Sequence, residues 1–233
     1  MASFSFSREG FASVLHTLGG KYALWGPKRL KGKGRFFGTD LVTCAPLESF
    51  DDLETGEKTS MSPKEIVFPP DETLFYFTGD RFSEPPLEDD RETVVFLRPC
   101  DINGFRRLDA MFLENGGAAD PYYRRRREKL HFFMIECRES FENCFCVSMG
   151  SNATDNYAAA FRFGEDSVEV EVKDPRFAQF FSSGTPSSFA PEFVKENVKK
   201  VTVPAVEEMP PELFVSPLWD EYDSRCIACG RCN

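Results

Sequence analysis

The pattern of apolar and polar residues predicts an amphipathic helix near the start of the chain, over residues 7–20. Its apolar positions recur at the spacing that places side chains on one helical face, and they are Phe11, Val14, Leu15 and Leu18. Ser7 is suited to be the N-cap, and Gly19-Gly20 is suited to end the helix. Residues 26–35 (GPKRLKGKGR) are instead basic and rich in glycine, which predicts a solvated loop.

Two continuous apolar runs predict strands that are buried on both faces of a sheet. They are TVVFLRP at 93–99 and LHFFMIE at 130–136. Between them, residues 101–115 carry apolar side chains at helical spacing, and they begin with Asp101, which is suited to be the N-cap. A strand, a helical segment and a second strand form a βαβ unit. We therefore expect the two strands to be parallel, with a right-handed crossover between them.

Shorter elements are expected around that unit. SPKE at 62–65 has the pattern of a capping box with proline in the first helical position, and it predicts one short turn. TLFYFT at 73–78 predicts a strand, and KKVTVPAV at 199–206 predicts a last edge strand. Two runs at 157–174 flank a turn at 164–166, and the second run alternates strictly, which predicts an antiparallel hairpin.

The elements together indicate an α/β fold, with a mixed sheet built from the βαβ unit and the added antiparallel hairpin. A loop is expected at 182–192, which is rich in serine, proline and glycine. Residues 207–225 include three prolines and predict a linker. We therefore expect one α/β domain over residues 1–205 and a tethered C-terminal piece over residues 206–233.

Composition narrows the class of protein. With 28 Lys and Arg against 38 Asp and Glu, the net charge is −10, which argues against a general nucleic-acid binder because such proteins need a basic face. The longest apolar runs are far shorter than the ~20 residues of a membrane span, and the N-terminal MASFSFSREG lacks the regions of a secretory signal. We therefore expect a soluble, cytoplasmic protein. The 25 phenylalanines predict an aromatic-rich core.

Eight cysteines in a reducing compartment favour metal ligation or redox chemistry over disulfides. Cys226, Cys229 and Cys232 have the spacing C-x2-C-x2-C, which lets three thiolates converge on one small object and matches the start of the ferredoxin motif C-x2-C-x2-C-x3-C-P. The sequence ends one residue after Cys232, so we expect this truncated ferredoxin-like tail to hold at best a labile, three-ligand [4Fe-4S] cluster, and more often no cluster. Zinc is the alternative, although it usually takes separated Cys or Cys/His pairs.

A second candidate cluster site consists of Cys100, Cys137, Cys144 and Cys146. Cys100 follows the first buried strand and Cys137 follows the second. If the strands are parallel neighbours, both cysteines lie at the carboxyl edge of the sheet, where open α/β sheets place their ligand sites. Cys144 and Cys146 form a C-x-C pair just downstream, whose thiolates can both point inward.

Positive charge near Cys100 fits an anionic thiolate cluster. Cys100 precedes the expected helix N-terminus, which carries a partial positive charge, and Arg98 and the run RRRR at 124–127 add cationic side chains. The simpler interpretations are that these cysteines are small buried hydrophobes at strand ends and that the arginines form a solvated helix face. Cys44, which has no partner in sequence, is expected in the core.

Three stretches of the chain closely resemble the iron–sulfur electron-transfer subunit of the anaerobic, NAD(P)H-dependent sulfite reductase and, more distantly, the β subunit of sulfhydrogenases. They are RPCDINGFRRLDAMFL, IECRESFENCFCVSMGSNATDNYAAAFRF and PLWDEYDSRCIACGRCN. The resemblance implies an electron-transfer role and two ferredoxin-type [4Fe-4S] motifs. Such a protein would pass electrons from a partner that binds FAD and NAD(P)H to a sirohaem partner that reduces sulfite to sulfide.

Carried over by residue, Cys226, Cys229 and Cys232 match the first three ligands of the first of those motifs. The fourth cysteine, its proline and the second motif are absent, so the resemblance implies a chain truncated within the first motif.

Two other classes of function remain open. The first is a docking or assembly module whose cysteines bind zinc or no metal. The second is a flavin- or nucleotide-binding enzyme that uses the glycine-rich stretch 26–35 and the strand ends, although no phosphate-binding signature supports it. His16 and His131 are the only histidines, which disfavours histidine-based hydrolysis, and no catalytic residue is identified.

Overall fold

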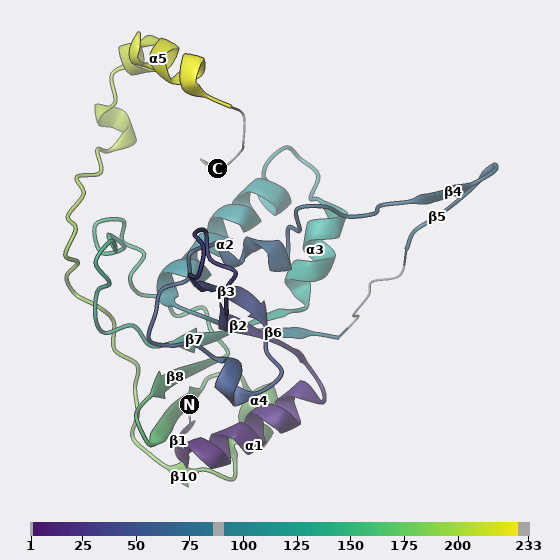
Figure 1. Ribbon diagram of the computed structural model, residues 1–233, viewed down its shortest axis with the longest axis vertical. Coiled ribbons are helices and arrows are strands. Elements are labelled where there is room, and N and C mark those ends of the chain that lie inside the picture. The colour runs from purple at the N-terminus through teal and green to yellow at the C-terminus, as the bar shows by residue number, and fades with distance from the viewer. Residues whose placement is uncertain (1, 86–90, 228–233) are drawn as a thin grey trace.

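The computed structural model describes residues 2–85 and 91–227 of the 233-residue chain. Its centre is an eight-stranded mixed sheet (Figure 1) with the strand order β10-β1-β9-β8-β7-β6-β2-β3. The strands are β1 (Ala2–Ser7), β2 (Ala23–Leu30), β3 (Leu41–Pro46), β6 (Thr93–Leu97), β7 (Leu130–Ile135), β8 (Ala159–Phe163), β9 (Ser167–Val172) and β10 (Thr185–Pro186). The expected mixed α/β fold is confirmed.

The helices in the described residues are mostly short. They are α1 (Arg8–Gly19), α2 (Pro99–Asp109), α3 (Pro121–Glu128), α4 (Pro175–Phe181) and α5 (Leu218–Arg225). One π-helical turn (Ala110–Glu114) extends α2, and 3-10 turns lie at Phe50–Asp52, Pro63–Ile66, Val206–Glu208 and Pro211–Val215. None of the helices within the described ranges is long and apolar enough to cross a bilayer.

The βαβ unit predicted from the two apolar runs is confirmed. β6 and β7 pair in parallel from Thr93 with Leu130 to Leu97 with Met134, and α2, the π-helical turn and α3 connect them. β2 and β8 add parallel neighbours on either side. The predicted hairpin is also confirmed, because β8 and β9 are antiparallel.

Alternation along the central strands divides the core into two layers. On β6, Val94 and Phe96 pack with α1 and α4, whereas Val95 and Leu97 pack with α2 and α3. Both faces of the strand are therefore buried, which explains why β6 and β7 read as continuous apolar runs. Figure 1 shows α1 and α4 on one side of the sheet and α2 and α3 on the other.

Phenylalanine fills the layer under α1 and α4, as the composition predicts. Phe96, Phe133 and Phe161 from three neighbouring strands have ring centroids 5.0–5.4 Å apart, and Phe11 and Phe177 join them from the helices. These spacings are those of favourable offset and edge-to-face aromatic pairs. The helix predicted over 7–20 is confirmed, with Ser7 accepting the hydrogen bond of the Gly10 N–H.

The prediction of a loop at 26–35 was wrong for residues 26–30, which belong to β2. Their charged side chains are partly exposed and are paired with carboxylates. Lys28 lies 3.1 Å from Asp52, and Arg29 lies 2.8 Å from Glu54. A Cβ on Gly26 would lie 2.9 Å from Leu53 Cδ1 and 3.2 Å from Phe96 Cβ, so a side chain there would require its neighbours to shift.

Two helix starts differ from the prediction. α2 begins at Pro99 with Arg98 as its N-cap, so Asp101 lies inside the first turn and is not the cap. The reason is that proline fits the first helical position, where no backbone N–H is needed. The short turn at Pro63–Ile66 forms as expected, but Ser62 makes no side-chain capping bond.

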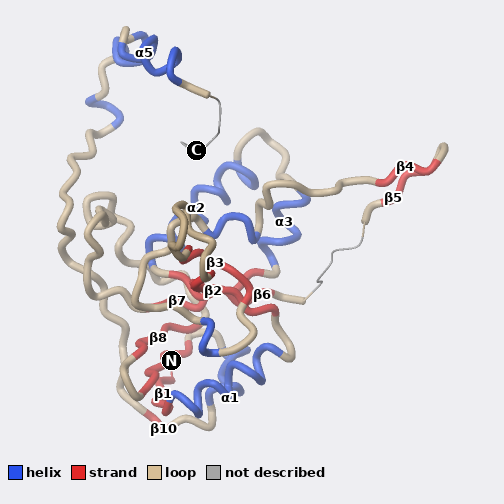
Figure 2. The backbone as a smooth tube through the Cα atoms, viewed as in Figure 1, coloured by secondary structure: helices blue, strands red, loops and turns tan. Residues whose placement is uncertain are grey.

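Two predicted strands were wrong or displaced. Of residues 73–78, only Tyr76–Thr78 form a strand, β4, which pairs with β5 (Arg81–Ser83) outside the main sheet. Figure 2 shows this hairpin standing away from the rest of the molecule. Residues 199–206 form no β-strand. The Val201 N–H donates to the Ser148 Oγ instead of joining a ladder.

Residues 209–217 run as coil and a 3-10 turn, as expected of a linker, but residues 218–225 of the predicted linker form the helix α5. The proposed boundary between residues 205 and 206 stays a prediction.

Candidate metal centre

Strand register brings Cys100 and Cys137 to one edge of the sheet. β6 ends at Leu97 and β7 ends at Ile135. Cys100 is the second residue of α2. Cys137 forms a parallel bridge with Phe193, and its carbonyl accepts the Val194 N–H at 2.7 Å. Both thiols are therefore fixed by regular structure at the carboxyl ends of parallel strands, as the sequence predicts.

Cys144 and Cys146 lie on the irregular segment 138–156, which we call the cysteine loop. Tight turns shape it. The Cys144 N–H donates to the Phe141 carbonyl at 3.0 Å, and the Ser151 N–H donates to the Cys146 carbonyl at 2.9 Å. Gly150 has φ +61°, a conformation that glycine adopts without strain. The loop has no strand or helix of its own, so its shape depends on contacts from outside it.

Three asparagines connect the loop to its surroundings, two from outside it and one from within it. Asn103 of α2 donates to the carbonyls of Ser151 (3.1 Å) and Ala153 (2.8 Å). Asn152 within the loop donates to the Val194 carbonyl at 2.8 Å. Asn197 reaches in from the C-terminal side and bonds the loop next to Cys146. The cysteine loop is thereby held between α2 and the segment that follows β10.

The four thiols are partly buried and lie within electrostatic range of one another. Burial, together with the smaller effects of the neighbouring charges of Asp101, Cys146, Cys137 and Cys144, raises the pKa of Cys100 to about 12. The pKa of Cys137 is also raised, mainly by burial, although Arg98 acts in the opposite direction. Cysteines that are far apart in the sequence thus share one small region of the sheet edge.

Arg98 is a buried cation in this region, as the sequence suggests. Its side chain is only 6% exposed, donates to the Thr55 carbonyl at 2.8 Å and stacks 4.7 Å over the Phe141 ring. The arginine run of α3 is directed elsewhere. Arg126 pairs with Glu72, and Arg127 pairs with Asp109. Those arginines are best described as an ion-paired helix face.

Four thiols are the ligand set of an iron–sulfur cube and also one of the ligand sets of zinc. Within residues 2–85 and 91–227, no three His, Cys, Asp or Glu side chains are placed to hold one metal ion. Tetrahedral zinc needs sulfurs about 3.8 Å apart, given a Zn–S bond of about 2.3 Å. An iron–sulfur cube spreads its four thiolates farther apart, because each binds its own iron. The four thiols match the second arrangement in number and kind, and their convergence on one cluster stays a prediction.

The remaining cysteines, those of the C-terminal tail and Cys44, lie outside the group of four mid-chain cysteines. Cys226 is exposed and follows α5, while Cys229 and Cys232 lie outside the described residues. Cys44 is buried in β3, as predicted, and burial raises the pKa of its thiol to about 12. Cys44 therefore behaves as a small core side chain.

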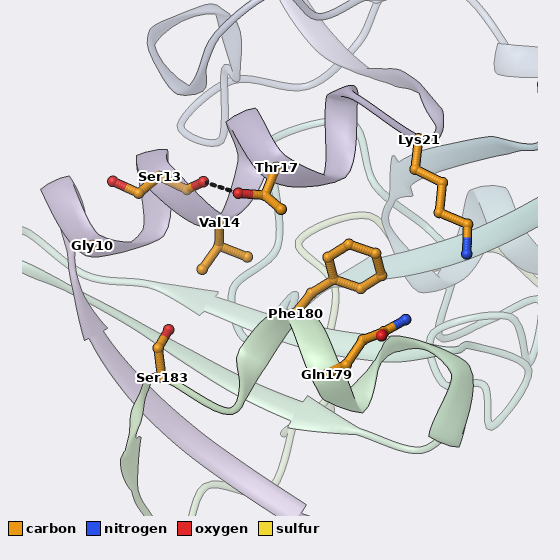
Figure 3. Close-up of a pocket in the computed structure, with 8 residues that line it drawn as sticks. All are labelled: Gly10, Ser13, Val14, Thr17, Lys21, Gln179, Phe180 and Ser183. Atoms are coloured by element: carbon orange, nitrogen blue, oxygen red, sulfur yellow. Dashed lines mark hydrogen bonds between the residues drawn. The ribbon is translucent and has the colours of Figure 1, made fainter.

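Two surface pockets lie away from the cysteines. One of about 480 Å³ lies between α1 and α4 (Figure 3) and is lined by Gly10, Ser13, Val14, Thr17, Lys21, Gln179, Phe180 and Ser183. The Ser13 and Thr17 hydroxyls donate to backbone carbonyls of their own helix. The other, of about 1100 Å³, lies by the amino ends of β2 and β6. Neither pocket, as lined by the described residues, includes the stretch 26–35, so the nucleotide-binding hypothesis gains no support.

Sequence reasoning missed Asn197 and Glu136. The Glu136 side chain is 3% exposed, and it accepts two hydrogen bonds from Arg162 and one from the Glu192 N–H. These bonds hold Glu136 in place, and Glu136 directly precedes Cys137. No local signal reveals such partners, because they lie 26 to 57 residues away in sequence.

Comparison with known proteins finds a relative. The chain is 27% identical over 225 residues to sulfhydrogenase 2 subunit beta of Pyrococcus furiosus, which covers 88% of this chain and 66% of that protein. The chain thus spans slightly less than two thirds of the relative's length, and the match supports a relation to that subunit. No family model matches the chain, and no solved structure matches it.

Proposed function

We propose that this chain is an electron-transfer subunit of an oxidoreductase complex. In this proposal Cys100, Cys137, Cys144 and Cys146 hold one [4Fe-4S] cluster, and Cys226, Cys229 and Cys232 supply three ligands of a second. The position of Cys100 and Cys137 at the carboxyl edge of two parallel strands, with the loop that carries Cys144 and Cys146 bonded to α2, is the observation that carries the proposal. The relation to a sulfhydrogenase β subunit supports it independently.

When bound, a [4Fe-4S] cluster supplies a one-electron redox centre. The chain's own residues bind and shield it. Each ligating thiol must lose its proton, so the raised pKa values of Cys100 and Cys137 mean that ligation competes with protons at neutral pH. Arg98 favours the ionised form of Cys137. Partial burial of the four thiols limits access of water to the site.

The specific complex is proposed from the sequence resemblance. We propose an anaerobic sulfite reductase, in which a partner that binds FAD and NAD(P)H donates electrons and a sirohaem partner uses them to reduce sulfite to sulfide. The name of the relative describes a sulfhydrogenase subunit, so partner subunits are part of the proposal in either case. Catalysis belongs to those partners, and this chain carries charge between them.

The decisive experiment isolates the mid-chain site. In a background with Cys226→Ser, Cys229→Ser and Cys232→Ser, the full chain is purified without oxygen and reconstituted with iron and sulfide. We expect about four irons and four sulfides per chain, and an EPR signal after reduction with dithionite. Cys100→Ser and Cys144→Ser should each lose most of that iron and the signal.

The matched control is Cys44→Ser, which changes a buried cysteine of the core and should keep the iron. A chain that binds one zinc and no iron would instead identify a docking or assembly module. A chain that stays colourless and iron-free would contradict the proposal for the mid-chain site.

A further inference from the structure

We propose that Asn197 is a positioning residue for the cysteine loop, one that orients the Cys146 sulfur and raises the reduction potential of the cluster that it ligates. The inference rests on the proposed function, since it assigns a role at the same site. Asn197 lies 51 residues from Cys146 in sequence, and neither a sequence motif nor the relative's name points to it.

The first observation is where the Asn197 side chain directs its polar atoms. It is 6% exposed, and its amide donates to the Cys146 Sγ at 3.6 Å and to the Ser140 Oγ at 3.0 Å. Its Oδ1 accepts the Val147 N–H at 2.7 Å. All of these bonds go to the cysteine loop.

The second observation is that these bonds surround Cys146. One holds its sulfur, another holds the next backbone amide, and the Cys146 carbonyl accepts the Ser151 N–H. A buried amide that lost such partners would retain the cost of leaving water. The native arrangement of the loop around Cys146 is therefore favoured over any arrangement that turns the sulfur away from Asn197.

The consequence follows from charge. An N–H donor near a ligating sulfur stabilises the more negative, reduced form of an iron–sulfur centre, which raises its reduction potential. Asn197 is neutral, so it does this without adding a charge that would attract or repel a partner. Its effect on the centre passes through Cys146, which is why it is a positioning residue.

Asn152 provides a matched control. Its side-chain amide also joins the cysteine loop to the segment around residue 194, donating to the Val194 carbonyl at 2.8 Å, but that bond contacts no cysteine. Asn152→Leu and Asn197→Leu thus remove one amide each between the same two segments, and only the second removes a bond to sulfur.

The experiment uses the full chain with the three tail cysteines changed to serine. In the metal-free protein, hydrogen exchange at the Val147 amide should become about tenfold faster in Asn197→Leu and stay unchanged in Asn152→Leu. In the reconstituted protein, an EPR-monitored redox titration measures the reduction potential of the bound cluster. This potential should be lower in Asn197→Leu than in wild type, and it should be unchanged in Asn152→Leu.

If Asn197→Leu does not fold, Asn197→Asp is compared with Asn152→Asp. Both add the same charge near the loop, and Asn197→Asp keeps the acceptor for the Val147 N–H while losing the donor to sulfur. It should therefore keep the exchange protection and show the larger fall in potential.

Equal potentials in the matched Asn197 and Asn152 variants would overturn the role in tuning. Unchanged exchange at Val147 in Asn197→Leu, or faster exchange there in Asn197→Asp, would overturn the role in positioning. If the wild-type chain binds no iron, the proposed function fails. The exchange measurement, which needs no cluster, then still decides whether Asn197 orders the loop.

Discussion

Cys100 and Cys137 each lie three residues beyond a registered pair of strand residues, Leu97 on β6 and Met134 on β7. Because parallel strands in register end at the same edge, these two thiols share that edge independently of the loop between them. The positions of Cys144 and Cys146 do not follow from strand register. Their positions depend on contacts to the cysteine loop from Arg98, Asn103 and Asn197.

Replacing Arg98 by alanine should loosen this region. The change removes the bond to the Thr55 carbonyl and the cation–π contact with Phe141, and we expect the free energy of unfolding to fall by about 2–3 kcal/mol because both contacts are sheltered from water. Urea unfolding measures the loss.

Arg8→Ala is the matched control, since exposed Arg8 makes the same two kinds of contact with Gly164 and Phe50. It should cost less than about 1 kcal/mol, and equal losses would contradict the prediction.

Replacing Arg162 by methionine should lower the free energy of unfolding, because it removes a partner of Glu136, the residue before Cys137. Glu136 is almost fully buried and would lose its two bonds of 2.6 and 2.7 Å to Arg162. Arg138 and the Glu192 N–H would remain as its partners. We therefore expect a loss of about 2 kcal/mol, below the 3–5 kcal/mol typical of a buried charge left alone. Glu136→Gln combined with Arg162→Met should recover part of it, and a double variant no more stable than the single one would refute the assignment.

The elements that the sequence predicts well are those whose signal is local. β6 and β7 are continuous apolar runs because helices cover both faces, and α1 has its cap and its apolar stripe within a dozen residues. The strand at 26–30 was missed because its charges are neutralised by Asp52 and Glu54, residues that come later in the chain. Nothing within the segment itself distinguishes paired charges from solvated ones.

The candidate site likewise contains residues whose positions the sequence predicts and residues whose positions it does not. The edge position of Cys100 and Cys137 follows from two strands and their order, so the sequence predicts it. Residues 199–206 alternate as a strand does, yet the Val201 N–H donates to Ser148 within the cysteine loop. Asn197 and Glu136 act through partners 26 to 57 residues away, and such contacts are set by tertiary packing alone.

Two glycines should respond in opposite directions to alanine. A Cβ on Gly26 would lie 2.9 Å from Leu53 Cδ1 and 3.2 Å from Phe96 Cβ, so Gly26→Ala should cost about 1–3 kcal/mol of overpacking. Gly104 is exposed inside α2, and a Cβ there meets nothing within 4 Å. Gly104→Ala should therefore stabilise the chain by about 0.5–1 kcal/mol through helix propensity. Thermal unfolding of both variants tests this, and a shift of the same sign in both would contradict it.

Acid should weaken the start of α4. The side-chain bond with Arg176 holds the pKa of Asp174 below its usual range, and the Arg176 backbone N–H adds to the effect. A depressed pKa in the folded state means that the carboxylate stabilises the fold above its unfolded pKa of about 3.9, and that this contribution disappears as pH falls through the folded value. Asp174→Asn should thus be less stable than wild type at pH 7, by less than about 1 kcal/mol.

The difference between wild type and Asp174→Asn should shrink toward zero as the pH is lowered below 3.9 or so, the unfolded value. Urea unfolding at a series of pH values measures it. Arg176→Ala removes the cation and should narrow the pH dependence in the same way, while a constant difference from pH 7 to pH 2 would rule out this role for the pair.

Removing metal should leave the sheet folded and free the cysteine loop. The two buried layers consist of aliphatic and aromatic side chains, with Cys44 the one cysteine among the described residues that form them. Folding of the sheet therefore does not depend on a cluster, whereas the cysteine loop, which has no regular structure of its own, gains order when its cysteines bind one.

We expect a chelator to leave the far-ultraviolet circular dichroism unchanged and to speed tryptic cleavage after Arg138, whose side chain is 54% exposed. Cleavage after Arg162 in β8 should stay slow, because that side chain is bound to Glu136. Loss of the β-sheet signal on chelation would show instead that metal and core fold as one unit.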